Sequence, residues 1–109
     1  MSKKGSYMLV HLLVFTYKEE NLAGRRYEAR LTCPAHLRDV IVNRYIRHHR
    51  DYRLEDERTA EIPTKVLKKA ARKTFVLAQR EVFSQQIGEY FGGEKAGAIV
   101  DCAQRIPKP

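Results

Sequence analysis

The chain has 109 residues, of which 43% are hydrophobic and 31% are charged. This balance excludes a disordered chain, and the length suits one core, so we expect residues 1–109 to form a single basic domain. The 21 Lys and Arg residues against 13 Asp and Glu residues give a formal net charge of +8, which attracts polyanions such as nucleic acid.

Cysteine content and apolar runs predict where the protein resides. Cys33 and Cys102 are too few for a disulfide-stapled secreted scaffold, so the sequence predicts a cytoplasmic protein. The apolar run of residues 8–15 is interrupted by His11 and has no Ala-x-Ala cleavage pattern after it, which favours a strand over a signal peptide. Since no run approaches about 18 apolar residues, we predict no membrane contact.

Two strands are predicted at the start of the chain. Residues 7–17 are apolar on both faces of the alternation, which is typical of a strand covered on both sides. Residues 26–32 alternate, with Tyr27, Ala29 and Leu31 on one face. The polar link between these runs ends in Gly24, so the two strands should form an antiparallel hairpin.

A first helix is predicted over residues 34–50, because Thr32 can cap it and Pro34 suits its first turn. Residues 53–62 contain the one acidic cluster and read as a connection with room for a short third strand. At 100° per residue the expected apolar face of this helix consists of Leu37, Val40, Ile41, Tyr45, His48 and Tyr52.

A long helical stretch begins at Pro63 and ends at Gly92, and its apolar face turns by roughly 130° partway along. One straight helix cannot bury both directions in one core. The stretch therefore breaks near residues 79–84, or its second half packs on another element, such as a last helix over residues 94–105 or a second subunit. The first half buries Val66, Leu67, Ala70, Ala71, Thr74, Leu77 and Ala78, and the second half presents Phe83, Ile87, Tyr90 and Phe91.

The predicted fold class is therefore α+β, with an N-terminal antiparallel hairpin followed by two or three helices. The four large side chains of the second half would form an exposed patch if nothing in the chain covered them. We therefore predict a homodimer whose interface contains Phe83, Ile87, Tyr90 and Phe91.

The basic face of the long stretch is the sharpest functional signal. Its spacing of i, i+3, i+4, i+7 and i+8 makes a stripe about 20 Å long on a straight helix, and no acidic residue lies between Ile62 and Arg80. Solvated helix faces usually mix signs, so this stripe predicts contacts with backbone phosphates, with the acidic residues of 53–62 as its internal competitor. The stripe consists of Lys65, Lys68, Lys69, Arg72, Lys73 and Arg80.

A second basic set lies on or after the first helix and is interleaved with Tyr45 and Tyr52. It consists of Arg38, Arg44, Arg47, Arg50 and Arg53, with His48 and His49. Arginine near tyrosine suits phosphate forks and base stacking. The alternative is that both tyrosines complete the core and the arginines are solvated. Arg44, inside the apolar arc, either extends its head to solvent or pairs with a carboxylate of residues 53–62.

Metal binding and catalysis have weak signals. Zinc ligands could be drawn from Cys33, His36, His48, His49 and Cys102, but structural zinc sites usually show two close ligand pairs. Asp51, Glu55, Asp56 and Glu57 could hold a nuclease metal, although acids in a polar connection are usually solvated. No nucleophile elbow or phosphate-binding loop is present. We therefore expect no metal, no cofactor and no enzymatic activity.

Residues 13–17 (Leu-Val-Phe-Thr-Tyr) and 23–26 (Ala-Gly-Arg-Arg) resemble the opening of the small Cas2-type CRISPR integration proteins. Lys18 stands where that family has its acidic residue, and the following helix and basic stretch do not match the family's ferredoxin-like order. The sequence therefore assigns the chain to no family.

The sequence favours a non-enzymatic nucleic-acid-binding domain, for DNA or RNA, that contacts the phosphate backbone through a basic helix face. The alternative is a small adaptor or inhibitor whose basic face docks onto an acidic protein partner.

Overall fold

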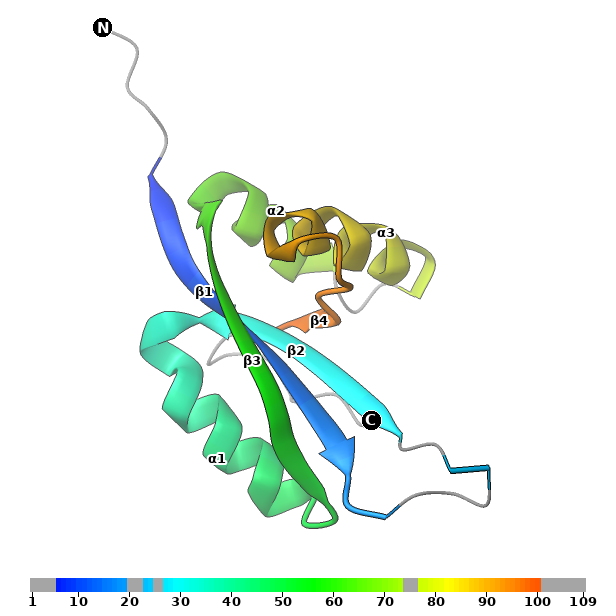
Figure 1. Cartoon of the computed structure of the whole chain (residues 1–109). Coiled ribbons are helices and arrows are strands. Elements are labelled where there is room, and N and C mark those ends of the chain that lie inside the picture. Colours follow the sequence, from blue (N-terminus) through cyan, green and yellow to red (C-terminus); the bar gives the residue numbers. More distant parts are fainter. Residues whose placement is uncertain (1–5, 20–22, 25–26, 74–76, 101–109) are drawn as a thin grey trace, which may run out of the picture.

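The computed structural model describes residues 6–19, 23–24, 27–73 and 77–100, with only the backbone for residues 71–73 and 77–80. Two strands open the described chain, a helix and a long strand follow, and two further helices lead to a short last strand (Figure 1). In chain order these are β1 (Tyr7–Tyr17), β2 (Glu28–Pro34), the 3-10 turn η1 (Ala35–Leu37), α1 (Arg38–His48), β3 (Tyr52–Pro63), α2 (Thr64–Lys73), α3 (Leu77–Gly88), the 3-10 turn η2 (Glu89–Phe91) and β4 (Ala98–Ile99).

The four strands form one mixed sheet in the order β3-β1-β2-β4. β1 pairs antiparallel with both β2 and β3, and the short β4 pairs parallel with β2. The predicted α+β class and the predicted hairpin of β1 and β2 are thus confirmed. No helix among the described residues is long and apolar enough to cross a membrane.

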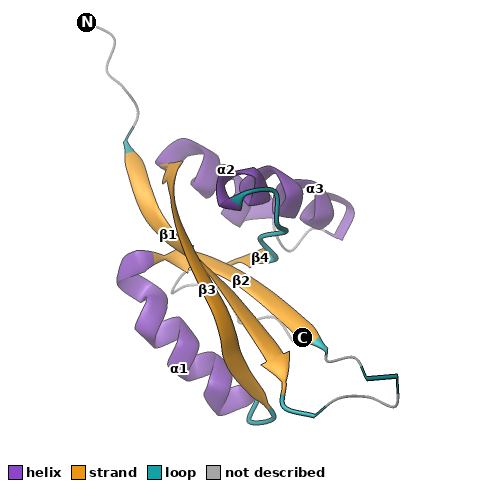
Figure 2. Cartoon of the chain, in the orientation of Figure 1, coloured by secondary structure: helices purple, strands orange, loops and turns teal. Residues whose placement is uncertain are grey.

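The sheet lies between helices, with α1 on one face and α2 and α3 on the other (Figure 2). Alternate residues of β1 point to the two sides: Leu12 and Val14 pack in the core under α2 and α3, whereas Leu13 and Phe15 pack in the core under α1. This confirms the prediction that the first strand is covered on both sides.

α1 begins later than predicted and buries a rotated face. The first three residues after Pro34 form the 3-10 turn η1, which advances further per residue around the axis than an α-helix does. As a result Val42 is buried beside Ile41 and Tyr45, while Val40 is 46% exposed. The expected places of His48 in the core and Tyr52 on this helix were wrong, because His48 is exposed and Tyr52 opens β3.

Residues 53–62, expected to be a connection, belong to the 12-residue edge strand β3. Its charged side chains are compatible with a strand because β3 pairs with β1 along one edge only and exposes many of its residues. A β-bulge lies opposite Val14 and Phe15, so the side-chain alternation changes phase partway along the strand. This phase change disguised the pattern in the sequence.

The turn of the apolar face along residues 63–92 reflects two separate helices. The expected break near residues 79–84 is misplaced, because α3 runs without interruption from Leu77 to Gly88 and α2 ends at Lys73. Since each helix is oriented independently, Leu67 and Ala70 of α2 share one core with Ile87 of α3 and Phe91.

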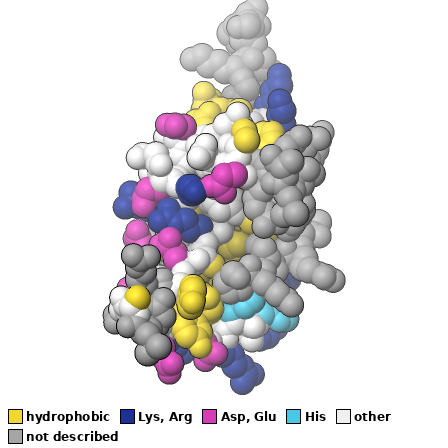
Figure 3. All heavy atoms as spheres, turned by 90° about the vertical axis from the view of Figure 1, so that its right-hand side faces the viewer, with side chains coloured by type: hydrophobic (Ala, Val, Ile, Leu, Met, Phe, Trp, Pro, Cys, Tyr) yellow, Lys and Arg dark blue, Asp and Glu magenta, His cyan; other side chains and the backbone are white. Residues whose placement is uncertain are grey.

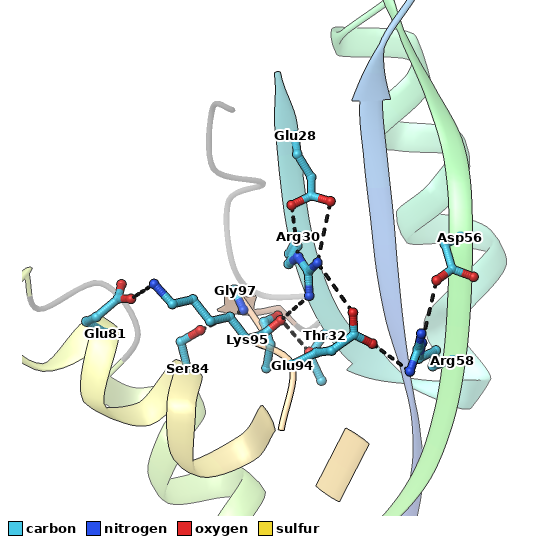
Figure 4. Close-up of polar contacts among 11 residues, drawn as sticks. Glu28, Arg30, Thr32, Asp56, Arg58, Glu81, Ser84, Glu94, Lys95 and Gly97 are labelled. Carbon is cyan, nitrogen blue, oxygen red and sulfur yellow. Dashed lines mark hydrogen bonds and ion pairs between the residues drawn. The ribbon is translucent and has the colours of Figure 1, made fainter. Parts of the chain in front are cut away.

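The predicted last helix over residues 94–105 is wrong for the described part, because residues 94–100 contain no helix and lead into β4. Residues 101–105 lie outside the described residues. Figure 4 shows how side chains fix this segment: Thr32 Oγ1 donates to the Ala96 carbonyl at 2.8 Å, and Gly97 N donates to Ser84 Oγ at 2.9 Å. These tertiary contacts override the helical pattern of the small residues.

Gly97 should tolerate substitution poorly, because both its backbone conformation and its surroundings exclude a side chain. Its φ is +70°, and a Cβ there would lie 2.0 Å from the Arg30 carbonyl oxygen. We expect Gly97→Ala to lower the free energy of unfolding by about 3 kcal/mol or more, because β4 would have to move off β2. Denaturant unfolding measures this change.

Gly92→Ala is the matched control, since Gly92 has a φ of +80° and a Cβ added there would meet no heavy atom within 4 Å. It should cost only the backbone strain of about 1 kcal/mol. Equal losses for the two variants would contradict the close approach of the segment to β2.

Candidate nucleic-acid interface

Three lysines of α2 form a single-sign surface. Lys65, Lys68 and Lys69 are exposed at i, i+3 and i+4, opposite the buried Leu67 and Ala70 of the same helix. α2 contains no acidic residue. Its remaining basic residues are Arg72 and Lys73, whose side chains lie outside the described part of the structure.

The predicted ridge is shorter than expected. Arg80 belongs to α3, so it does not continue a straight ridge that begins at Lys65. The basic positions of α2 alone, from Lys65 to Lys73, span about 12 Å. The single ridge of about 20 Å on one helix was wrong because the chain forms two helices here.

The acidic residues of β3 neutralise arginines and not the α2 lysines. Glu57 accepts two hydrogen bonds from the Arg38 guanidinium, both at 2.7 Å, and Asp56 lies 3.5 Å from Arg58. Glu55 pairs with Arg53 at 3.3 Å. Within the described residues, no ion pair involves Lys65, Lys68 or Lys69.

A second set of ion pairs lies on the face of the sheet that α2 and α3 cover. The Glu94 carboxylate lies 2.7 Å from Arg58 and 3.6 Å from Arg30, which also pairs with Glu28 at 3.2 Å (Figure 4). Lys95 pairs with Glu81 of α3. On the side of the molecule in Figure 3, Lys and Arg side chains accordingly lie next to Asp and Glu side chains. This charge-balanced surface is a poor anion site.

The structure does not bring the two predicted basic sets together. α1 and α2 cover opposite faces of the sheet, so the arginines of α1 do not lie beside the α2 lysines (Figure 1). Arg47 and Arg50 are exposed, and Arg44 is partly buried. No described carboxylate pairs with Arg44. Of the interleaved tyrosines, Tyr45 is fully buried and Tyr52 is partly buried.

A polar cluster joins α1 to the sheet. Glu57 bridges Arg38 and His11, whose Nδ1 lies 2.5 Å from the Glu57 carboxylate. The Arg38 guanidinium is the main cause that lowers the pKa of Glu57, with His11 adding to it against the effect of burial. Sequence reasoning placed Arg38 in the second basic set and missed this pair.

Cys33 lies beneath this cluster, fully buried and opposite His11 in the β1–β2 register. Burial, and then the Glu57 carboxylate, raise the pKa of the Cys33 thiol to about 12, with Arg38 opposing them. The thiol therefore stays protonated at neutral pH, which suits a core residue and not a nucleophile. Among the described residues no group of three or more His, Cys, Asp and Glu could hold a metal ion. Cys102 lies outside them.

The predicted dimer interface divides between core and surface. Ile87 and Phe91 are at most 5% exposed in the core of their own chain, so they do not form the expected exposed patch. Phe83 is partly buried against that core, and Tyr90 is 41% exposed. The homodimer itself stays a prediction.

Sequence reasoning also missed that Tyr17 and Tyr27 meet at the end of the hairpin. Tyr27 was expected on a buried strand face with Ala29 and Leu31, but it is 61% exposed at the start of the second hairpin arm. The readable signal was their position on either side of the hairpin link, which places the two residues next to each other across the strands.

Comparison of the chain with protein-family models, with curated proteins and with solved structures finds no match. Its function therefore has to be argued from its own residues.

Tyr45 provides a test of the core under α1. Its hydroxyl is buried with no hydrogen-bond partner in the described structure, and burial, followed by the nearby Tyr52, raises its pKa. Tyrosine in an unfolded chain ionises near pH 10, whereas folded Tyr45 resists ionisation. Stability is therefore retained below that pH and falls as pH rises above it.

We expect Tyr45→Phe to remove part of this alkaline loss of stability. At neutral pH it should leave the free energy of unfolding unchanged within about 1 kcal/mol or raise it, since an unpaired buried hydroxyl is lost. Denaturant unfolding at neutral and alkaline pH measures both effects. A neutral-pH loss of more than about 2 kcal/mol would show that the hydroxyl has a partner.

Proposed function

We propose that this chain is a non-enzymatic nucleic-acid-binding domain that contacts backbone phosphates through α2. The observation that carries the proposal is the exposed set Lys65, Lys68 and Lys69, which has one sign and no described ion pair. The arginines Arg30, Arg38 and Arg58, in contrast, pair with carboxylates of the chain. Charge is thus balanced around the sheet and left unbalanced on α2.

The unbalanced charge has a cost in the free protein. Like charges at i,i+3 and i,i+4 repel by a few tenths of a kcal/mol per pair, about 0.2–0.5. Lys65 also lies in the first turn of α2, where the helix dipole is already positive. A polyanion bound to this face would offset the repulsion between the lysines and the unfavourable interaction of Lys65 with the helix dipole. Its binding would also release the polyanion's condensed counterions. An acidic protein surface is the alternative ligand for the same face.

The test is the binding of a labelled DNA duplex and of a labelled RNA, followed by fluorescence anisotropy at salt concentrations between about 50 and 200 mM. We expect Lys65→Gln, Lys68→Gln and Lys69→Gln together to weaken duplex binding by on the order of 10- to 100-fold. The slope of log affinity against log salt should fall by about three, or one for each lost phosphate contact.

The matched control is the double substitution of Arg44 and Arg47 by Gln, which removes two positive charges from α1 on the opposite face and is compared with the double substitution of Lys68 and Lys69 by Gln. We expect it to keep duplex affinity within about threefold. Equal losses in the two double variants would mean that net charge alone attracts the duplex and that the α2 assignment is wrong. If the intact protein bound neither nucleic acid at low salt, an acidic protein partner would replace the proposal.

A further inference from the structure

Three tyrosines at or next to the ends of three strands meet at the end of the sheet that lies away from α2. Tyr17 ends β1, Tyr52 opens β3 directly opposite it, and Tyr27 precedes β2. The ring centroids of Tyr17 and Tyr52 are 5.2 Å apart, and those of Tyr17 and Tyr27 are 6.5 Å apart. The Tyr17 amide also donates to the Tyr27 carbonyl at 2.9 Å, which fixes the two backbones side by side. We call Tyr17, Tyr27 and Tyr52 the tyrosine cluster.

The core supports the tyrosine cluster from one side. Tyr45 stacks on Phe15 with a centroid distance of 4.0 Å and contacts Tyr52 edge-on at 6.1 Å. Tyr45 and Phe15 are fully buried, Tyr17 and Tyr52 are partly buried, and Tyr27 is 61% exposed. The row of rings thus runs from the core into solvent, with its inner members held rigidly and its outer ring open. Rigid aromatic surface with a polar tip is well suited to stacking.

Two basic residues lie next to the tyrosine cluster, one following Tyr17 in the sequence and one following His49, which contacts Tyr52. Lys18 follows Tyr17, and Arg50 follows His49, whose ring lies 6.3 Å from that of Tyr52. Lys18 and Arg50 are both exposed, and no described carboxylate pairs with them. The adjacent acids are Glu19 and Asp51, also exposed, so the flank is mixed in charge and the aromatic rings must supply most of the selectivity.

We propose that the tyrosine cluster, with Lys18 and Arg50, is a stacking site for unpaired bases of a single-stranded nucleic acid. Bases stack on aromatic rings with little regard to sequence, while cations beside the rings hold the backbone. A duplex keeps its bases stacked on one another and offers the cluster only phosphates. The site should therefore favour single strands, whereas α2 should bind either form.

This inference rests on the proposed function for its class of ligand but not for its location. The start of α2 follows Pro63, which pairs with Tyr7 at one end of β1, and the tyrosine cluster lies at the Tyr17 end (Figure 1). An 11-residue strand separates the two surfaces by roughly 30 Å. Substitutions at one surface can therefore be interpreted without disturbing the other.

The chain has six tyrosines and no tryptophan, so its intrinsic emission reports on tyrosine alone. The experiment titrates the intact protein with oligothymidylate, with oligouridylate and with a DNA duplex of the same length, following tyrosine emission and the anisotropy of labelled strands. We expect both single strands to quench the emission and the duplex to quench it much less. A difference between the two single strands would distinguish DNA from RNA as the preferred source.

Tyr27→Ala should weaken single-strand binding about tenfold and leave duplex binding unchanged, while Tyr27→Phe should bind as the parent chain does. Tyr7→Ala is the matched control, because Tyr7 is 63% exposed against 61% for Tyr27 and lies at the other end of β1. It should leave the single-strand affinity unchanged. Because Tyr27 is largely exposed, its substitutions should not alter the melting curve, which circular dichroism checks.

Each negative result would have a different meaning for the two proposals. If Tyr27→Ala binds single strands as tightly as the parent while the α2 triple variant loses binding, the stacking site is refuted and the proposed function stands. Equal losses for Tyr27→Ala and Tyr7→Ala would also refute it. If the intact protein binds no nucleic acid, both proposals fail and the cluster becomes a candidate protein contact.

Discussion

β1 places apolar side chains on both faces of the sheet, and Leu12, Leu13, Val14 and Phe15 are all at most 5% exposed. Burying a side chain of this size stabilises a fold by about 1.5–3 kcal/mol, so neither face can be left in water. α1 covers one face, and α2 and α3 cover the other. Since the helices lie on opposite faces of the sheet, the charged side chains on their solvent-facing sides form separate surfaces. The division of this protein into two basic surfaces is therefore a consequence of one doubly covered strand.

Arginine and lysine have different places in this structure. Arg30, Arg38 and Arg58 form ion pairs that link the sheet to α1 or to the segment after α3, where a planar guanidinium can contact two carboxylate oxygens or two partners at once. The lysines of α2 stand on a helix whose own sequence contains no acid. Glu57 and Glu94 thus pair with arginines of the same chain and link the sheet to α1 and to the segment after α3. Of the exposed cations without a described partner, Lys65, Lys68 and Lys69 lie on α2 and Arg47 lies on α1.

The sequence was sufficient for elements whose patterns are local. The hairpin, the double cover of the first strand, the region of α1 and the start of α2 at Thr64 all followed from alternation and helix signals. β3 was expected as a short strand at most, and its full length was not predicted, because its bulge breaks the alternation and its charges pair with residues on α1 and after α3. β4 was read as helix because the segment is held extended by tertiary contacts, such as those of Thr32 and Ser84, that no local pattern reports. The exposed lysines of α2 could be predicted from spacing alone, whereas the meeting of Tyr17 with Tyr52 depends on a strand register that no local pattern specifies.

β3 is an outer strand of 12 residues, long enough to act as a template for a strand of another molecule. Charges of both signs alternate irregularly along it, from Arg53 through Asp56 and Arg58 to Glu61, and the bulge opposite Val14 twists it away from a flat edge. A further strand would have to match both the signs and the twist before it could add its hydrogen bonds. The charged composition that concealed β3 in the sequence therefore also protects the sheet from open-ended growth into fibres.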